Sequence, residues 1–293
     1  MALTIHTNYS SLLTQTNLNK TNNALAVNQQ RLGTGLRINS SADDAAGLQI
    51  ATRLGSQSKG MAVALRNVSD ASSLLQTADG AFGEMTDILQ RMKDIATQSA
   101  NSTNGVDDRK SMQAEYNELG KELGNIMDNT SYAGEKLLGK NGETGKFKDP
   151  MGFQIGASKD EVLSLDVHLQ AKGVGTKLSA VSTQYDPVRT TGAAVEVSSS
   201  GDANANIDKL TAALDAVGEL RGQFGASINR LAHTANNLSN MKDNTEMARG
   251  RIMDADFASE SAMSSKNSML MQSGISMLKQ TAQMPQMVMS LLG

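Results

Sequence analysis

A sustained seven-residue repeat of apolar side chains between residues 54 and 99 constrains the fold of this chain more than any other feature. Apolar residues recur every seven positions, and a second apolar position, mostly alanine, follows three places later. This is the spacing of the two core positions of a coiled coil, so it predicts one long helix that buries a narrow stripe against other helices. At 1.5 Å per residue, a helix over this stretch is roughly 70 Å long. The first series is Leu54, Met61, Val68, Leu75, Phe82, Leu89 and Ala96, and the second is Ala64, Ala71, Ala78, Met85 and Met92.

The composition agrees with an elongated helical protein. Aromatic residues make up only 3% of the 293 residues, tryptophan and cysteine are absent, and there are 17 methionines, which indicates a narrow, aliphatic and adaptable core. The absence of cysteine excludes a disulfide framework and thiol chemistry. A net charge of -3 gives no electrostatic reason to expect nucleic acid. No apolar run is long enough for a membrane span, and residues 1–10 lack the pattern of a cleavable secretory signal.

The residues before the long helix predict a weaker helix. Leucines recur at Leu18, Leu25 and Leu32, and the first 40 residues contain no acidic side chain. Such a helix has a thin apolar stripe and is too polar to remain folded alone. Two glycines end it, and Ser41 followed by Asp44 matches a capping box, so the long helix is expected to begin near residue 42.

The middle of the chain predicts one shorter helix and then an irregular region. Steps of four and three among apolar residues between 112 and 126 predict a helix that folds back along the first. Residues 131–201 lose the helical period, residues 153–155 and 162–167 predict a β-hairpin, and residues 176–201 are typical of a variable surface loop. A second long helix is expected from about residue 206 to residue 252, with only Arg221 interrupting its apolar face.

The last segment, residues 257–293, again repeats at seven and carries few charges. The order of weak helix, strong helix, irregular middle, strong helix and weak helix predicts that the two ends pair and the middle lies at the far tip. The expected fold is mainly α, a rod-like antiparallel helical bundle or coiled coil with a small β-hairpin and paired N- and C-terminal helices. The C-terminal repeat consists of Met263, Leu270, Met277, Met284 and Leu291.

Several short motifs in the same order resemble those of bacterial flagellins. They cover roughly residues 1–170 and 205–293, and include residues 31–40 (RLGTGLRINS), 43–48 (DDAAGL), 89–93 (LQRMK), 153–156 (FQIG), 229–231 (NRL), 251–257 (RIMDADF) and much of 285–292. The resemblance implies a self-polymerising subunit of the extracellular flagellar filament. It implies a polymerisation domain from residues 1–41 and 257–293, a rod domain from 42–175 and 203–256, and a short surface insertion at 176–202 in place of a large outer domain.

The resemblance also implies partners and interface residues. Gln90, Arg91, Ile95 and Gln98, with Glu115 on the following helix, match a flagellin surface that contacts neighbouring subunits and is recognised by innate immune receptors. From the residues alone, an ordinary solvated face with one apolar flank position, Ile95, is the favoured interpretation of this patch. The terminal stripe of Leu18, Leu25, Leu32 and the C-terminal repeat is the expected polymerisation surface. The implied partners are further copies of the chain, an export chaperone on the C-terminal helix, a filament cap protein, hook–filament junction proteins and immune receptors.

No residue pattern predicts an enzyme, a cofactor or a metal site. The three histidines, His6, His168 and His233, lie in separate segments, and no zinc-protease or nucleophile motif is present. Asp254 and Asp256 precede a predicted helix and are better explained as capping acids than as metal ligands. The competing interpretations are a hook–filament junction protein, which has similar terminal helices, and another secreted coiled-coil protein.

Overall fold

The computed structural model describes residues 8–140, 144–186 and 195–292, with the side chains of the last helix described as far as residue 283. The described chain is mainly α-helical and carries two small antiparallel sheets, which confirms the predicted fold class. The helices are α1 (Tyr9–Thr34), α2 (Ala45–Ala100), α3 (Val106–Asn129), α4 (His168–Val181), α5 (Ser200–Met253) and α6 (Phe257–Leu292), with a short 3-10 helix η1 (Lys146–Lys148). The strands are β1 (Ser131–Tyr132), β2 (Glu135–Lys136), β3 (Met151–Gln154) and β4 (Val162–Leu165).

The chain forms two compact units, each described here by itself. Unit 1 consists of Met1–Ser58 and Asp243–Gly293 and contains α1 and α6. Unit 2 is Lys59–Lys242 and contains α3, α4, both small sheets and most of α2 and α5. The boundaries therefore fall within the two long helices rather than at their ends.

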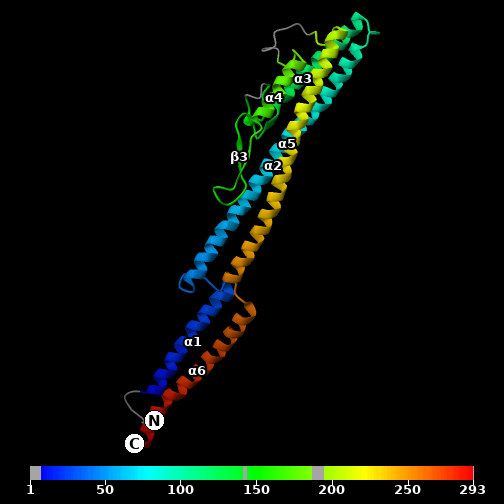
Figure 1. Ribbon diagram of the computed structural model, residues 1–293. Coiled ribbons are helices and arrows are strands. Elements are labelled where there is room, and N and C mark those ends of the chain that lie inside the picture. Colours follow the sequence, from blue (N-terminus) through cyan, green and yellow to red (C-terminus); the bar gives the residue numbers. More distant parts are fainter. Residues whose placement is uncertain (1–7, 141–143, 187–194, 293) are drawn as a thin grey trace. The chain divides into compact units, whose positions relative to one another are not determined.

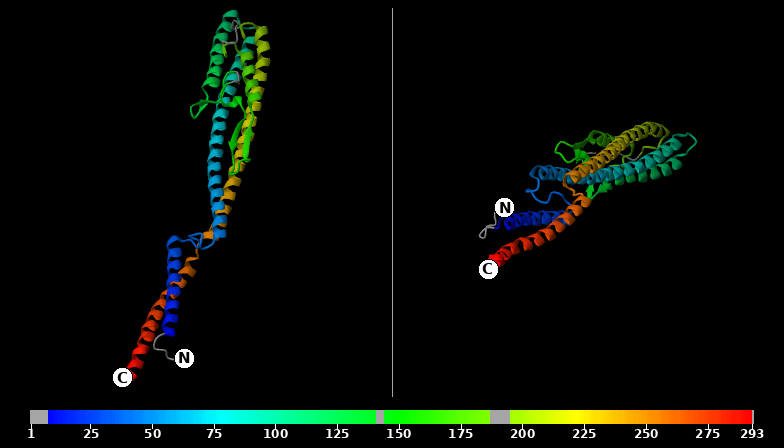
Figure 2. Two further views of the ribbon diagram at one scale, coloured as in Figure 1. Left: turned by 90° about the vertical axis from the view of Figure 1, so that its left-hand side faces the viewer. Right: turned by 90° about the horizontal axis from the view of Figure 1, so that it is seen from below.

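The heptad seam of α2 is the centre of the core of unit 2. Every seam residue from Met61 to Ala96 is buried, whereas Leu54 at its start is only half-buried. The partner is α5, which runs beside α2 in unit 2 (Figures 1 and 2). On α5 one series of buried positions again recurs at seven, and it consists of Leu210, Val217, Phe224, Leu231 and Leu238.

Aromatic packing and one ion pair complete this core. Phe224 lies between Phe82 of α2 and Phe147 of η1, with ring centroids 5.9 and 5.3 Å away. Arg221, the exception in the apolar face of α5, places its Nε 3.0 Å from Oδ1 of Asp79. The interruption is therefore a charge on the flank of the seam that has a partner on the neighbouring helix.

Two glycines in α3 are explained by close packing. Their missing side chains weaken the helix by about 1 kcal/mol each relative to alanine. A Cβ on Gly120 would collide with the side chain of Ser182, and a Cβ on Gly124 would lie 2.6 Å from the carbonyl oxygen of Tyr185. The segment after α4 can pack directly on α3 only because both positions lack a side chain.

The predicted hairpin is present. β3 and β4 pair antiparallel with Phe153 opposite Leu163, and Leu163 and Leu165 point into the core. The hairpin lies close to α2, where Asn67 Nδ2 donates to the carbonyl oxygen of Gln154 at 3.2 Å. A Cβ on Gly60 would come within 2.8 Å of the Cβ of Ala157, so the hairpin tip rests against a helix position that has room only for glycine.

Three sequence-based expectations about the middle of the chain and the helix starts are wrong. The region expected to be irregular contains α4, whose buried residues Ala171, Val174, Leu178 and Val181 follow helical spacing, and residues 176–181 are therefore helix rather than surface loop. Tyr185 and Val197 are also fully buried, while residues 187–194 of the expected insertion lie outside the described part of the chain. Similarly, α5 begins at Ser200, six residues before the expected start.

The start of α2 differs as well. The helix begins at Ala45 rather than near residue 42, and its first turn is capped by Asp44, whose Oδ1 accepts from the amide of Gly47 at 2.8 Å. Ser41 lies in the turn before the helix. The capping residue is therefore the acid at the end of the expected capping box rather than the serine at its beginning.

Candidate subunit-interface site

The terminal helices α1 and α6 pack side by side in unit 1, as expected for paired ends (Figure 2). Local hydrogen bonds and one glycine define both ends of α1 and the start of α6. Asn8 Oδ1 accepts from the amide of Ser11 at 3.0 Å at the start of α1, and Gly35 ends that helix in the left-handed conformation at φ 72°. Asp256 Oδ1 accepts from the amide of Ala258 at 3.0 Å at the start of α6, which agrees with the expected capping role of this acid.

The contact face between α1 and α6 is poor in large apolar groups. On each helix the half-buried positions alternate steps of four and three, as in a coiled coil. On α1 the face contains Thr14, Leu18, Thr21, Leu25, Asn28 and Leu32, and on α6 it contains Ser264, Asn267, Met271, Gly274, Leu278 and Thr281. About half of these side chains are small or polar, so little apolar area is removed from water when the two helices pair.

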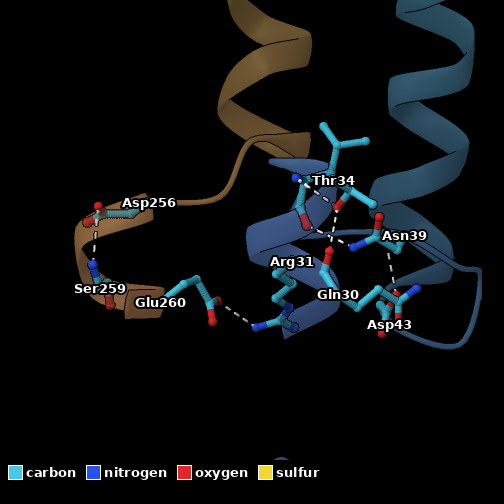
Figure 3. Close-up of polar contacts among 9 residues, drawn as sticks. Gln30, Arg31, Thr34, Asn39, Asp43, Asp256, Ser259 and Glu260 are labelled. Atoms are coloured by element: carbon cyan, nitrogen blue, oxygen red, sulfur yellow. Dashed lines mark hydrogen bonds and ion pairs between the residues drawn. The ribbon is translucent and has the colours of Figure 1, made fainter. Parts of the chain in front are cut away.

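A buried ion pair joins the two helices near the C-terminal end of α1 and the N-terminal end of α6 (Figure 3). Arg31 Nη1 donates to Oε1 of Glu260 at 3.0 Å, and the Glu260 side chain is only 8% exposed. Arg31 Nε, Glu260 Oε2 and Asn28 Nδ2 are also buried, and none of them finds a hydrogen-bond partner among the described residues. Near the other end of the contact, Asn8 Nδ2 donates to the carbonyl oxygen of Thr281 at 2.8 Å.

The two segments that lead out of α1 and into α6 form a short two-stranded bridge. The amide of Arg37 donates to the carbonyl oxygen of Met253 at 2.6 Å, and the amide of Ala255 donates to that of Gly35 at 3.0 Å. Ile38 is buried here in a small cluster with Ala51 and Met253. Among the described residues of unit 1, this cluster beside the bridge is the compact apolar anchor.

Asp43 holds the turn before α2 in place (Figure 3). Its Oδ2 accepts from the amides of Ser40 at 2.8 Å and Asn39 at 3.0 Å. These hydrogen bonds, with that of Ser40 the largest cause, lower the pKa of the Asp43 carboxyl below 3.8 because they favour its charged form.

The structure separates the two halves of the expected terminal stripe. Leu18, Leu25 and Leu32 face α6, whereas Met263, Leu270 and Met277 on α6 lie beside the contact face and are 48%, 48% and 51% exposed. The side chains of Met284 and Leu291 lie outside the described residues. The α1 leucines therefore contribute to the contact within the chain, whereas these three α6 residues remain open to water. We call Met263, Leu270 and Met277 the α6 stripe.

Four of the five residues of the expected lateral patch lie on the surface. Gln90, Arg91, Gln98 and Glu115 are exposed, and Arg91 joins α2 to α3 through hydrogen bonds of 3.0 and 2.6 Å from Nε and Nη2 to Oε1 of Glu115. Ile95 is 2% exposed and belongs to the core of unit 2. Its position beside the heptad seam is covered by neighbouring elements, so its side chain is not available at the surface.

Sequence reasoning missed the Arg31–Glu260 pair. The sequence contained the information needed, because α1 and α6 carry very few charged side chains. Arg31 and Glu260 have opposite charges, one near the end of α1 and the other near the start of α6. Charges are rarely kept in such contacts without a partner. Pairing the rare charges of two helices already expected to lie together would have predicted the contact.

The two buried phenols are structural: Tyr116 donates to the carbonyl oxygen of Val181 at 3.0 Å and Tyr185 to that of Lys140 at 2.6 Å. Burial raises the pKa of both phenols well above the usual value, which keeps them protonated. The described residues include no group of three His, Cys, Asp or Glu placed to hold a metal ion, and no described helix has the length and apolarity to cross a membrane.

The fold defines a class of protein: a mainly helical protein with paired terminal helices that leave apolar side chains exposed on α6. Comparison with known proteins identifies the family. The family model "Bacterial flagellin N-terminal helical region" matches residues 5–143, and "Bacterial flagellin C-terminal helical region" matches residues 207–292. The chain therefore belongs to the bacterial flagellin family, and it is a structural subunit of the flagellar filament.

The relatives support this assignment over the full length of the chain. Flagellin A of Vibrio anguillarum is 34% identical over an alignment of 378 residues that covers 100% of each chain. Flagellin of Halalkalibacterium halodurans is 37% identical over 94% of this chain and 93% of its own. Because the first alignment is longer than 293 residues, the Vibrio protein contains residues without a counterpart here, in agreement with a short flagellin. These names favour a filament subunit over a hook–filament junction protein.

A solved structure shares the fold with lower sequence similarity. It is described as that of a flagellar hook-associated protein from Vibrio parahaemolyticus, and it matches with a TM-score of 0.56 and 15% identity. It covers 72% of this chain and 100% of its own. At this identity the likeness concerns the fold alone. Membership of the flagellin family implies self-polymerisation and a place in the extracellular filament.

Proposed function

We propose that the α1–α6 pair is the polymerisation domain of this subunit and that the α6 stripe contacts neighbouring copies of the chain. The observation that carries this proposal is the exposure of Met263, Leu270 and Met277 beside a contact face that is largely small and polar. Exposed apolar side chains that recur at seven on one helix are matched by a helical partner. In this proposal residues 1–41 and 257–293 form the inner part of the filament, and residues 42–175 and 203–256 form the surrounding rod.

The weak apolar contact between α1 and α6 couples their order to assembly. When two helices bury little apolar area together, the free energy gained by burial does not offset the conformational entropy lost on ordering them. Neighbouring copies that cover the α6 stripe supply the missing burial, so folding of the ends and polymerisation become one step. Head-to-tail contacts of this kind do not close, and they produce a helical polymer.

Truncation tests the proposal. Removing about the last 30 residues leaves the core of unit 2 intact, so the truncated protein should stay soluble and helical but should not elongate filament fragments used as seeds. Electron microscopy and sedimentation measure the outcome. Long filaments formed by the truncated protein would contradict the proposal, and so would failure of the full-length protein to elongate the same seeds.

A point substitution tests the stripe itself. Leu270→Asn places an amide in the α6 stripe and should raise the critical concentration for seeded polymerisation by about tenfold or more, because the amide loses water without gaining a partner. The matched control is Ser268→Asn, at an exposed position of the same helix outside the stripe. Equal critical concentrations for the two variants would exclude the stripe as a contact.

The surface patch of Gln90, Arg91, Gln98 and Glu115 is proposed as a second contact, used between subunits in the filament and by innate immune receptors when subunits are released. The ion pair of Arg91 with Glu115 supports this, since it presents a guanidinium and a carboxylate from two helices on one exposed face. Arg91→Ala should reduce filament assembly or receptor activation, and Arg66→Ala, at another exposed arginine of α2, should change neither. If Arg91→Ala leaves both activities unchanged, the patch has no such role.

The remaining partners follow from the same surfaces. An export chaperone would cover α6 before secretion through the flagellar type III pathway, and a cap protein and junction proteins would contact the ends of the filament outside the cell. The proposed role is structural, without enzymatic activity. In a limited-proteolysis experiment on the unassembled subunit, we expect the chaperone to protect α6 of the full-length chain from digestion. We expect it to leave the digestion of the α6-truncated chain unchanged.

A further inference from the structure

The methionines among the described residues differ widely in exposure. Those of the unit 2 core, such as Met61, Met85, Met92 and Met127, are at most 1% exposed. Met263 and Met277 in the α6 stripe are 48% and 51% exposed in the single chain. Thioethers are oxidised where an oxidant can reach the sulfur, so an oxidant meets the α6 stripe while the core is shielded.

We propose that Met263 and Met277 form an oxidation-sensitive site that controls polymerisation of the unassembled subunit, with peroxides as the reacting class. The inference rests on the proposed function of the α6 stripe. A sulfur lone pair attacks one peroxide oxygen, an S–O bond forms as the O–O bond breaks, and the leaving hydroxide takes up the displaced proton as water. The sulfur loses two electrons and becomes a sulfoxide, and the peroxide is reduced by the same two electrons.

The consequence for assembly follows from the polarity of the product. A sulfoxide is a strong hydrogen-bond acceptor, whereas the thioether it replaces is a soft apolar group. In the single chain the new oxygen remains in water, so the fold is unaffected. In an apolar contact between subunits the oxygen loses water without finding a donor, and each such group should raise the critical concentration by about tenfold. Reduction by methionine sulfoxide reductase restores the thioether.

The helix provides its own control. Met269 is 67% exposed, but it is adjacent to Leu270 in the sequence and therefore lies about 100° around the helix from the stripe. Met247 on α5 is 55% exposed and belongs to a different helix. Both sulfurs are accessible to peroxide, yet neither is in the α6 stripe, so their oxidation should leave polymerisation unchanged.

The experiment compares full-length proteins in a background where Met284, Met287 and Met289 are leucine in every sample. Purified subunits are treated with hydrogen peroxide, the sites are quantified by mass spectrometry, and the critical concentration for seeded polymerisation is measured. We expect an increase of about tenfold or more for the background protein, little change for Met263→Leu/Met277→Leu, and the full increase for Met247→Leu/Met269→Leu. Treatment with sulfoxide reductases should reverse the increase, and the thermal unfolding midpoint of the subunit should not change.

Three outcomes would overturn the inference. The critical concentration could stay unchanged after oxidation of both stripe methionines, or it could rise equally in the Met263→Leu/Met277→Leu protein. Alternatively, a lowered unfolding midpoint could account for the reduced polymerisation. An untreated Met263→Gln/Met277→Gln protein distinguishes failure of the oxidation inference from failure of the proposed function of the α6 stripe. If that protein polymerises normally, the α6 stripe is not a contact at all. If it fails to polymerise while oxidised background protein succeeds, only the oxidation site is wrong.

Discussion

Units 1 and 2 use the same seven-residue repeat in opposite ways. In unit 2 the repeat is buried, because the seam of α2 is covered by α5 and the elements around it, and Phe224 packs against both Phe82 and Phe147. In unit 1 the contact between α1 and α6 is largely small and polar, and large apolar side chains of α6 remain exposed. A heptad pattern therefore predicts that a helix needs a partner, but not that the partner belongs to the same chain.

The largest difference between the units should appear in core truncations. Phe224→Ala removes the ring between two aromatic neighbours and should lower the free energy of unfolding by about 3–5 kcal/mol. Leu270→Ala in the exposed α6 stripe should change it by no more than about 0.5 kcal/mol in the unassembled subunit. Chemical denaturation of the two variants measures this, and comparable losses would mean that α6 is as well packed as the core.

The buried ion pair of unit 1 gives the next largest effect. Glu260→Leu leaves the guanidinium of Arg31 largely buried without its carboxylate and should destabilise the α1–α6 pair by about 1–3 kcal/mol. Faster hydrogen exchange in α1 and α6 would report the change, and Arg31→Met/Glu260→Leu should recover much of the protection. Glu118→Leu, which breaks an exposed pair with Lys121, is the control and should change little. Unchanged exchange in Glu260→Leu would show that the pair does not hold the helices together.

A smaller effect is expected where the hairpin meets α2. Gly60→Ala places a methyl group against Ala157 and should cost about 1–2 kcal/mol, with faster exchange in β3 and β4. Gly80→Ala, in the same helix with no neighbouring atom within 4 Å of the added group, should instead stabilise the protein by about 0.5–1 kcal/mol. Stabilisation by both substitutions would show that the hairpin is not tightly placed.

The smallest effect is on the stability of the turn before α2 at low pH. Because the folded-state pKa of Asp43 lies below 3.8, the hydrogen bonds of its carboxylate stabilise the turn before α2 above that pH. The stabilisation should be lost as the pH falls from about 3.8 through the lowered folded-state pKa. Asp43→Asn should remove this part of the acid dependence, measured as hydrogen exchange at Ser40 and Asn39. A turn with the same acid dependence in both proteins would contradict the assignment.

Much of the architecture could be predicted because its signals are local. The period of α2, the stripe on α5, the alternation in β3 and β4 and the capping acid Asp256 each depend on residues close in sequence. The helix α4 was missed although its buried residues have helical spacing, because two glycines and a threonine interrupt the pattern and the neighbouring segments are irregular. The sequence placed the candidate site on α1 and α6, but it did not distinguish the residues that face the partner helix from those that remain open to water.

The sequence by itself determined the two long helices, the terminal helices and α3, that the ends pair, that the chain resembles flagellins, and which side chains repeat at seven. Only the tertiary structure decided which repeats are covered. Ile95 is buried although it lies off the seam, and Met263 and Met277 are open although they follow the repeat. The physical reason is that periodicity records the geometry of one helix, whereas burial depends on what the rest of the chain, or a further copy of it, places against each face.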